Sequence, residues 1–179
     1  MIRLFAAVEL PDEIAATLSR RQQGLPGARW HDRDKLHLTL AFYGEVAEPV
    51  AAEIDEGLAD IRLAPFEIEL RGAGAFGEGG DIRAVWAGVE QSPALLDLAD
   101  RCRNVGRKAG VAIEKRTYRP HVTLAYIRRP DPDRTAAWIA NHNLLHSPPF
   151  EVGWFGLYSS WLSKEGSRYE LEREYSLRP

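Results

Sequence analysis

Apolar and polar residues alternate along several short stretches of the chain, which is the pattern of strands with one buried face. The clearest case is the run FEIEL at 66–70, where every second residue is apolar. Strand-forming residues predict further strands over 2–10, 37–43, 82–89, 111–113, 150–160 and 169–177, and one that starts at His121. A link across residues 164–166 is expected to join the last two strands.

Other stretches carry apolar residues three or four positions apart and predict amphipathic helices. The clearest stripe follows Pro49 and consists of Val50, Ile54, Leu58 and Ile61. Prolines at positions 11, 93 and 132 open similar stretches, as expected for the first turn of a helix. Consecutive strands with short links favour antiparallel sheets, so we predict an α+β fold with about eight strands and roughly three or four helices.

One tetrapeptide pattern occurs twice, as His-Leu-Thr-Leu at 37–40 (the first motif) and His-Val-Thr-Leu at 121–124 (the second motif). The flanking residues match as well, HLTLAFYG against HVTLAYIR. Nearly half of the 179-residue chain separates the two copies, which is not a solenoid period. We therefore expect a single domain over residues 1–179, made of two intimate lobes that each contribute one motif to a central cleft.

Side chains alternate between the faces of a strand, so the His and Thr of each motif share one face. Two imidazoles that face each other across a cleft can act as acid and base near pH 7, where histidine titrates. The hydroxyls of Thr39 and Thr123 could hold a phosphoryl oxygen. Arg119, two positions before His121, could neutralise its charge if the strand starts early enough. These residues suit the cleavage of a phosphodiester with an alkoxide leaving group. The reaction needs no metal, because His37 and His121 together supply both proton transfers.

Other interpretations of the same residues remain. A lone strand histidine is usually an ordinary hydrogen-bonded residue, but recurrence in matching contexts favours a site. A metal site is less favoured, because His142 and His146 lack the glutamate of the zinc-protease helix motif and His31 has no fitting carboxylate pattern. The glycine-rich stretch 72–77 could cradle phosphate, but strands are predicted on both sides of it, so a hairpin connection is the better interpretation. No cofactor is expected.

The composition restricts the partners. The chain has 23 basic and 26 acidic residues and a net charge of −3, so a nucleic-acid partner would have to bind a local basic patch. The single cysteine, Cys102, excludes an internal disulfide and falls on an apolar helix face, which predicts a buried thiol. Because the chain lacks a signal-peptide pattern and a run of about 18 apolar residues, we expect a cytoplasmic protein without membrane contact. No obligate protein partner is evident.

The doubled motif resembles the HxTx signature of the 2H phosphoesterase superfamily. Further segments resemble, in the same order, the bacterial RNA 2′,3′-cyclic phosphodiesterases once called 2′-5′ RNA ligases. These segments are RLFAAVELP, HLTLAFYGEV, FEIELRGAGAF with VWAGV, RPHVTLAY and the closing stretch from FEVGW to EYSL. The resemblance therefore spans nearly the whole chain.

The resemblance implies a bilobal α+β fold, with two mostly antiparallel sheets and flanking helices related by a pseudo-twofold axis around the cleft. It also implies metal-independent hydrolysis of a 2′,3′-cyclic phosphate, on an RNA 3′ end or a nucleotide, to a 2′-phosphate. His37 and His121 would be the catalytic pair, and Thr39 and Thr123 would bind the phosphate. Since the 3′ oxygen leaves, our working assignment has His121 as the base toward water and His37 as the acid, although the sequence does not fix this order.

The chain departs from that branch at Tyr126, where an arginine is often found. Tyr126 could stack on a base, as Phe42 or Tyr43 could, although packing would explain each of these residues equally well. The same site could instead carry out ATP-independent 2′-5′ ligation, the reverse reaction, or cleave 2′-5′ linkages. The alternative without catalysis is a module that binds RNA ends.

Overall fold

The computed structural model describes residues 1–164 and 166–179. The helices in this part of the chain are α1 (Asp12–Ser19), α2 (Glu48–Ala59), α3 (Pro93–Lys108) and α4 (Pro132–His142), with short 3₁₀ helices η1 (Arg33–Lys35) and η2 (Gly79–Asp81). The strands are β1 (Ile2–Glu9), β2 (Ala28–Trp30), β3 (His37–Val46), β4 (Phe66–Ile68), β5 (Leu70–Phe76), β6 (Ala84–Val89), β7 (His121–Ile127), β8 (Phe150–Val152), β9 (Trp154–Ser163) and β10 (Gly166–Ser176). The predicted α+β class is confirmed.

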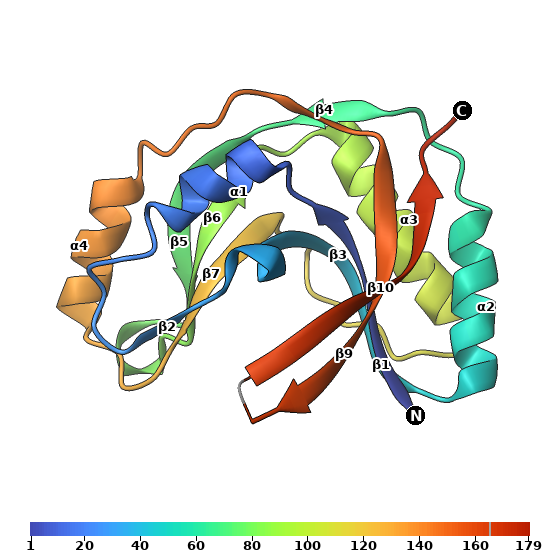
Figure 1. The fold of residues 1–179 in the computed structure, drawn as a ribbon, viewed down its shortest axis with the longest axis horizontal. Coiled ribbons are helices and arrows are strands. Elements are labelled where there is room, and N and C mark those ends of the chain that lie inside the picture. The colour runs from blue at the N-terminus through green and yellow to red at the C-terminus, as the bar shows by residue number, and fades with distance from the viewer. Residues whose placement is uncertain (165) are drawn as a thin grey trace.

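Eight of the strands form one antiparallel sheet in the order β10-β9-β1-β3-β7-β6-β5, in which β2 also pairs with β7. The strands β4 and β8 form a separate two-stranded sheet. Within the large sheet, β3 and β7 meet at one registered pair, Leu38 opposite Val122. The strands expected in two lobes are thus the two halves of one continuous sheet, joined in the middle of both motifs (Figure 1).

Helices cover both halves of this sheet. In Figure 1, α2 and α3 lie beside β1, β3 and β10, whereas α4 lies beside β5. Ile54 of α2 and Leu98 of α3 are fully buried, and they belong to the same core as Leu38. The opposite side of the two motif strands carries the histidines and threonines, which stay partly exposed. No helix in the described part of the chain is long and apolar enough to cross a membrane.

The glycine-rich stretch 72–77 is not the loop that the sequence suggested, because β5 runs through most of it and pairs with β6. Gly74 lies opposite Trp86, and a Cβ atom at Gly74 would lie 2.4 Å from the indole ring. The absence of a side chain therefore lets the Trp86 ring lie across the neighbouring strand. This stretch is a strand that serves packing in the sheet.

Other boundaries differ from the predictions for local reasons. Residues 111–113 form no strand, since Val111 and Ile113 pack against the core without pairing. The first-motif strand continues beyond Gly44, whose φ of +70° accommodates a register shift there. The strand predicted at 66–70 divides between the two sheets, and the one predicted at 150–160 divides at Gly153. Residue 165, in the link expected between the last two strands, lies outside the described residues.

The contact between Gly74 and Trp86 can be tested by adding one methyl group. We expect Gly74→Ala to lower the free energy of unfolding by about 1–3 kcal/mol, because the Cβ atom overpacks the indole ring. Urea unfolding measures this change. Gly80→Ala is the matched control, since a Cβ atom at Gly80 meets no atom within 4 Å. Equal stability of the two variants would contradict this account of the stretch.

Candidate active site

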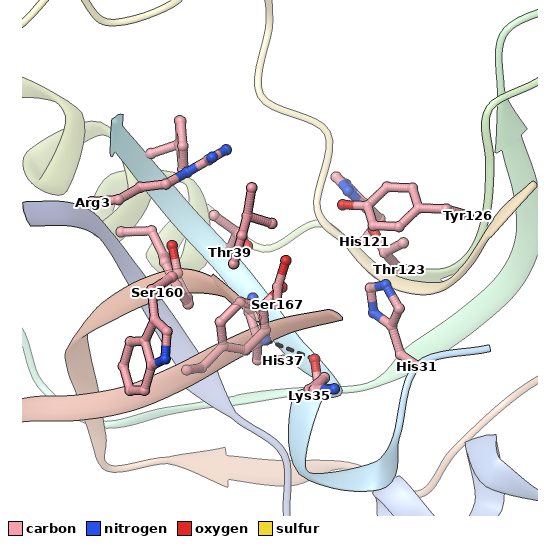
Figure 2. Close-up of a pocket in the computed structure, with 15 residues that line it drawn as sticks. Arg3, His31, Lys35, His37, Thr39, His121, Thr123, Tyr126, Ser160 and Ser167 are labelled. Carbon is pink, nitrogen blue, oxygen red and sulfur yellow. Dashed lines mark hydrogen bonds between the residues drawn. The ribbon is translucent and has the colours of Figure 1, made fainter. Parts of the chain in front are cut away.

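A cleft of about 180 Å³ opens on the exposed side of β3 and β7, next to the joint between the two halves of the sheet. It is lined by the polar residues of both motifs, His37, Thr39, His121 and Thr123 (Figure 2). The strand alternation buries the intervening residues beneath these side chains. The structure thus brings together four residues that the sequence places far apart.

The imidazole of His37 is held in one orientation by the backbone. Its Nδ1 atom lies 2.8 Å from the carbonyl oxygen of Lys35, a contact drawn as a dashed line in Figure 2. A carbonyl can only accept, so Nδ1 carries the hydrogen and the lone pair of the neutral ring is on Nε2. Phe5 stacks on the ring at a centroid distance of 5.0 Å, and Tyr169 meets it edge-on at 5.3 Å. The aromatic side chains leave the ring little freedom to turn.

The second motif repeats this arrangement with different neighbours. His121 Nδ1 lies 2.6 Å from the carbonyl oxygen of Arg119, again two residues upstream, so the same tautomer is fixed. Its ring packs edge-on to Phe76 at 4.7 Å and lies 6.1 Å from Trp86. Each catalytic candidate therefore has Nε2 as the nitrogen that remains for a substrate.

Burial makes both imidazoles weak bases in the free protein. The pKa of His37 falls from its ordinary value of 6.5 to about 4, mainly by burial, and the charges of His31 and His121 lower it further. The hydrogen bond to the Lys35 carbonyl opposes this shift. The pKa of His121 is also lowered by burial, against the effect of the Arg119 carbonyl. At pH 7 both rings are neutral, with a lone pair on Nε2.

The alternation of β3 and β7 breaks at the same place in both motifs. On β3, Thr39 and Ala41 lie opposite consecutive residues of β1, so Leu40 is an extra residue. On β7, Leu124 is the extra residue in the same way. These bulges turn the next aromatic residues, Phe42 and Tyr126, to the cleft side, where they are 49% and 57% exposed.

The arrangement of the motifs agrees with the comparison to known families. A family model described as the 2′-5′ RNA ligase superfamily matches residues 10–160. The chain belongs to the 2′-5′ RNA ligase superfamily. The resemblance inferred from the doubled motif is thereby confirmed.

Relatives in this superfamily match along nearly the whole chain. A protein of Archaeoglobus fulgidus named RNA 2′,3′-cyclic phosphodiesterase is 31% identical, with 94% of this chain and 97% of the relative covered. The protein of the same name from Escherichia coli K12 is also 31% identical, with 98% and 96% covered. The crystal structure of E. coli LigT complexed with 3′-AMP superimposes with a TM-score of 0.82 at 29% identity, covering 99% of each chain.

In this member of the 2′-5′ RNA ligase superfamily, a third histidine lines the cleft. His31 is pinned beside the second motif, because its backbone N–H donates to the Leu124 carbonyl at 2.8 Å. Gln22 Nε2 donates to the carbonyl oxygens of both residues, at 2.7 and 3.1 Å. The His31 ring meets Tyr126 edge-on at 5.1 Å, and its buried Nδ1 atom has no hydrogen-bond partner among the described residues. No local pattern in the sequence indicates this placement of His31.

Positive charge enters the cleft of this superfamily member from residues that the sequence did not single out. Arg3 lies over the ring of Phe42, with its guanidinium carbon 5.1 Å from the ring centroid. It is directly opposite Ser160 of β9, which also lines the cleft. Lys35 approaches from η1 and is paired with Asp32 at 2.9 Å. Arg3 and Lys35 are the arginine and the lysine of the cleft lining, and both are labelled in Figure 2.

Two of the predicted site residues are placed elsewhere. Arg119 precedes β7 and is exposed outside the cleft lining, since the strand begins only at His121, after Pro120. Its carbonyl, not its guanidinium, serves the site. Tyr43 is only 4% exposed, and its hydroxyl donates to the Cys102 carbonyl at 3.0 Å, so it cannot stack on a base. The Cys102 thiol is buried as predicted.

The two remaining histidines lie outside the cleft lining. His142 stacks on Trp138 at 4.3 Å, and His146 pairs with Glu69 at 3.2 Å. Across residues 1–164 and 166–179, no three His, Cys, Asp or Glu side chains lie close enough together to hold a metal ion.

The protonation of His37 can be followed by NMR titration of its imidazole nitrogens. We expect an apparent pKa of about 4 in the free protein. His31→Phe should raise it, because the variant removes a positive charge that disfavours protonated His37 while keeping a ring beside Tyr126. His146→Phe, outside the cleft, is the control and should leave it unchanged. A His37 that titrates near 6.5 in the unaltered protein would show that burial does not control the site.

Proposed function

We propose that the chain hydrolyses 2′,3′-cyclic phosphates, on RNA 3′ ends or on nucleosides, to 2′-phosphates by acid–base catalysis at His37 and His121. The observation that carries the proposal is the paired arrangement of these imidazoles. Each has Nδ1 fixed on a backbone carbonyl two residues upstream, and both rings line one cleft. The relatives named RNA 2′,3′-cyclic phosphodiesterase support the choice of substrate.

In the proposed reaction, His121 Nε2 takes a proton from a water molecule while the oxygen of that water attacks the phosphorus. The new phosphorus–oxygen bond forms while the bond from phosphorus to the 3′ oxygen breaks. His37 Nε2, which must be protonated at this point, gives its proton to the leaving 3′ oxygen. The 2′ oxygen keeps the phosphate, and the two histidines end with exchanged protonation states.

The negative charge on the non-bridging phosphate oxygens must be stabilised by hydrogen-bond donors of the protein. Thr39 and Thr123 share the cleft with the histidines, so their hydroxyls can donate to these oxygens. Arg3 and Lys35 supply positive charge from β1 and η1. Because the cleft is partly buried, these interactions are stronger than they would be in water.

To act as the acid, His37 must be protonated when the substrate is bound. In the free protein the pKa of His37 is about 4, so the ring is neutral near pH 7. A bound phosphate anion favours the protonated ring and raises this pKa. Binding of the cyclic phosphate would therefore favour protonation of His37, the proposed acid.

The activity can be tested with a short RNA that ends in a 2′,3′-cyclic phosphate, in EDTA near neutral pH. We expect conversion to the 2′-phosphate. His37→Ala and His121→Ala should each lower kcat/KM by about 10²–10⁴-fold, the usual contribution of a positioned acid or base. His146→Ala is the matched control and should keep full activity, because it lies outside the cleft. Products are resolved by chromatography against 2′- and 3′-phosphate standards.

Three results of that assay would change the proposal. A 3′-phosphate product would mean that the 2′ oxygen leaves. Joining of the RNA to an added strand with a 5′-hydroxyl would show that ligation competes with hydrolysis. Tight binding of the cyclic end without turnover would favour an RNA-end binding module.

The protonation of the acid on binding gives a separate test. Inorganic phosphate at saturating concentration should raise the pKa of His37 above about 4, as measured by the same imidazole NMR titration. The sign follows from the negative charge of the ligand, which stabilises the protonated ring. If the pKa of His37 stays unchanged while that of His121 rises, the acid and base roles are reversed.

A further inference from the structure

A second hollow of about 390 Å³ lies beside the cleft, between η1 and the outer part of the β9–β10 hairpin. We call it the side groove. It shares Lys35, Trp161, Ser167 and Tyr169 with the cleft, so the two spaces adjoin one another. A ligand that reacts at the histidines can therefore extend into the side groove without leaving the protein surface.

Exposed apolar side chains gather around these two adjoining spaces. Among the described residues, seven large hydrophobic side chains are exposed, and four of them, Phe42, Tyr126, Trp161 and Leu162, line the cleft. Trp161 also borders the side groove and is 46% exposed. An exposed tryptophan ring is unfavourable in the free protein, because its apolar surface stays in contact with water. Exposed rings of this kind are typical of a surface that binds a ligand.

The charges of the side groove suit a nucleoside better than a phosphate. Asp32 and Asp34 line it together with Lys35 and Arg168, so the two signs balance. Carboxylates repel a phosphate but accept hydrogen bonds from base amino groups and ribose hydroxyls. Trp161 provides a ring on which a base of any sequence can stack.

The junction of the two spaces offers hydrogen-bond donors. Lys35, whose ammonium group also pairs with Asp32, and the hydroxyl of Ser167 lie where cleft and side groove meet. Both can donate to a phosphate oxygen. The histidines thus line the cleft alone, Lys35, Ser167 and Trp161 line both spaces, and the carboxylates line the side groove alone. This arrangement can take a cyclic phosphate in the cleft, with a phosphodiester and a nucleoside next to it.

We propose that the side groove binds the nucleoside on the 5′ side of the cyclic end, with its base stacked on Trp161. The linking phosphodiester then passes Lys35 and Ser167. The proposal rests on the proposed function and narrows it, because the preferred substrate becomes an RNA chain of at least two nucleotides and not a free cyclic nucleotide.

The experiment compares two substrates, a nucleoside 2′,3′-cyclic phosphate and a trinucleotide that ends in the same cyclic nucleotide. For the unaltered protein we expect a higher kcat/KM on the trinucleotide. Trp161→Ala should lower the ratio of the two kcat/KM values about tenfold, mainly through KM for the trinucleotide, as expected for the loss of one stacked base. Trp161→Phe, which keeps a ring, should restore part of the ratio. Leu144→Ala removes another exposed side chain, away from both hollows, and should leave the ratio unchanged.

Each outcome decides one question. A ratio near one in the unaltered protein, or an unchanged ratio in Trp161→Ala, would overturn the side-groove proposal but not the proposed function. If Trp161→Ala lowers kcat/KM equally for both substrates, Trp161 contacts the reacting nucleotide itself, and the side-groove proposal is also overturned. If neither substrate is turned over, the proposed function fails. Dissociation constants for the trinucleotide 2′-phosphate and the nucleoside 2′-phosphate then test the side groove, with the same expected change of their ratio in Trp161→Ala.

Discussion

The pairing of Leu38 with Val122 is the contact on which the site depends. It joins the two halves of the sheet at one registered pair, and both side chains are fully buried. With these residues fixed toward the core, strand alternation turns the histidine and threonine of each motif to the opposite side. A shift by one residue in either strand would bury an imidazole and expose a leucine or valine, so the register that stabilises the sheet also assembles the cleft.

The two halves support their histidines by the same backbone device but surround them with different neighbours. A carbonyl two residues upstream fixes the tautomer in both. On the His37 side, Arg3 and Ser160 lie in register on neighbouring strands, and the rings of Phe5 and Tyr169 pack on the imidazole. On the His121 side, Gly74 leaves room for the Trp86 ring, which lies near the imidazole but outside the cleft lining. The repeated centre of the site is thus held by different neighbours on its two sides.

The sequence was sufficient where a pattern was repeated or long. The doubled motif predicted both histidines and threonines, and apolar spacing predicted all four helices. Irregularities of one or a few residues could not be predicted from the sequence. The bulge at Leu40 shifts the alternation, so that Phe42 and not Tyr43 faces the cleft. The strand β2 has only three residues, too few to show a period, and its pairing with β7 is what brings His31 to the site. Such details arise from pairing between distant segments, which local patterns do not record.

The position of β1 between β3 and β9 has a consequence for how the protein is made. Of the described strands, β1 leaves the ribosome first and β9 and β10 leave last, so one edge of β1 stays without its partner until β9 has been made. Tyr169, which packs on the His37 ring, is carried by β10. A nascent chain can therefore hold both motifs and still lack one of the rings that orient His37. The cleft is completed only after the β9–β10 hairpin has emerged and β9 has paired with β1.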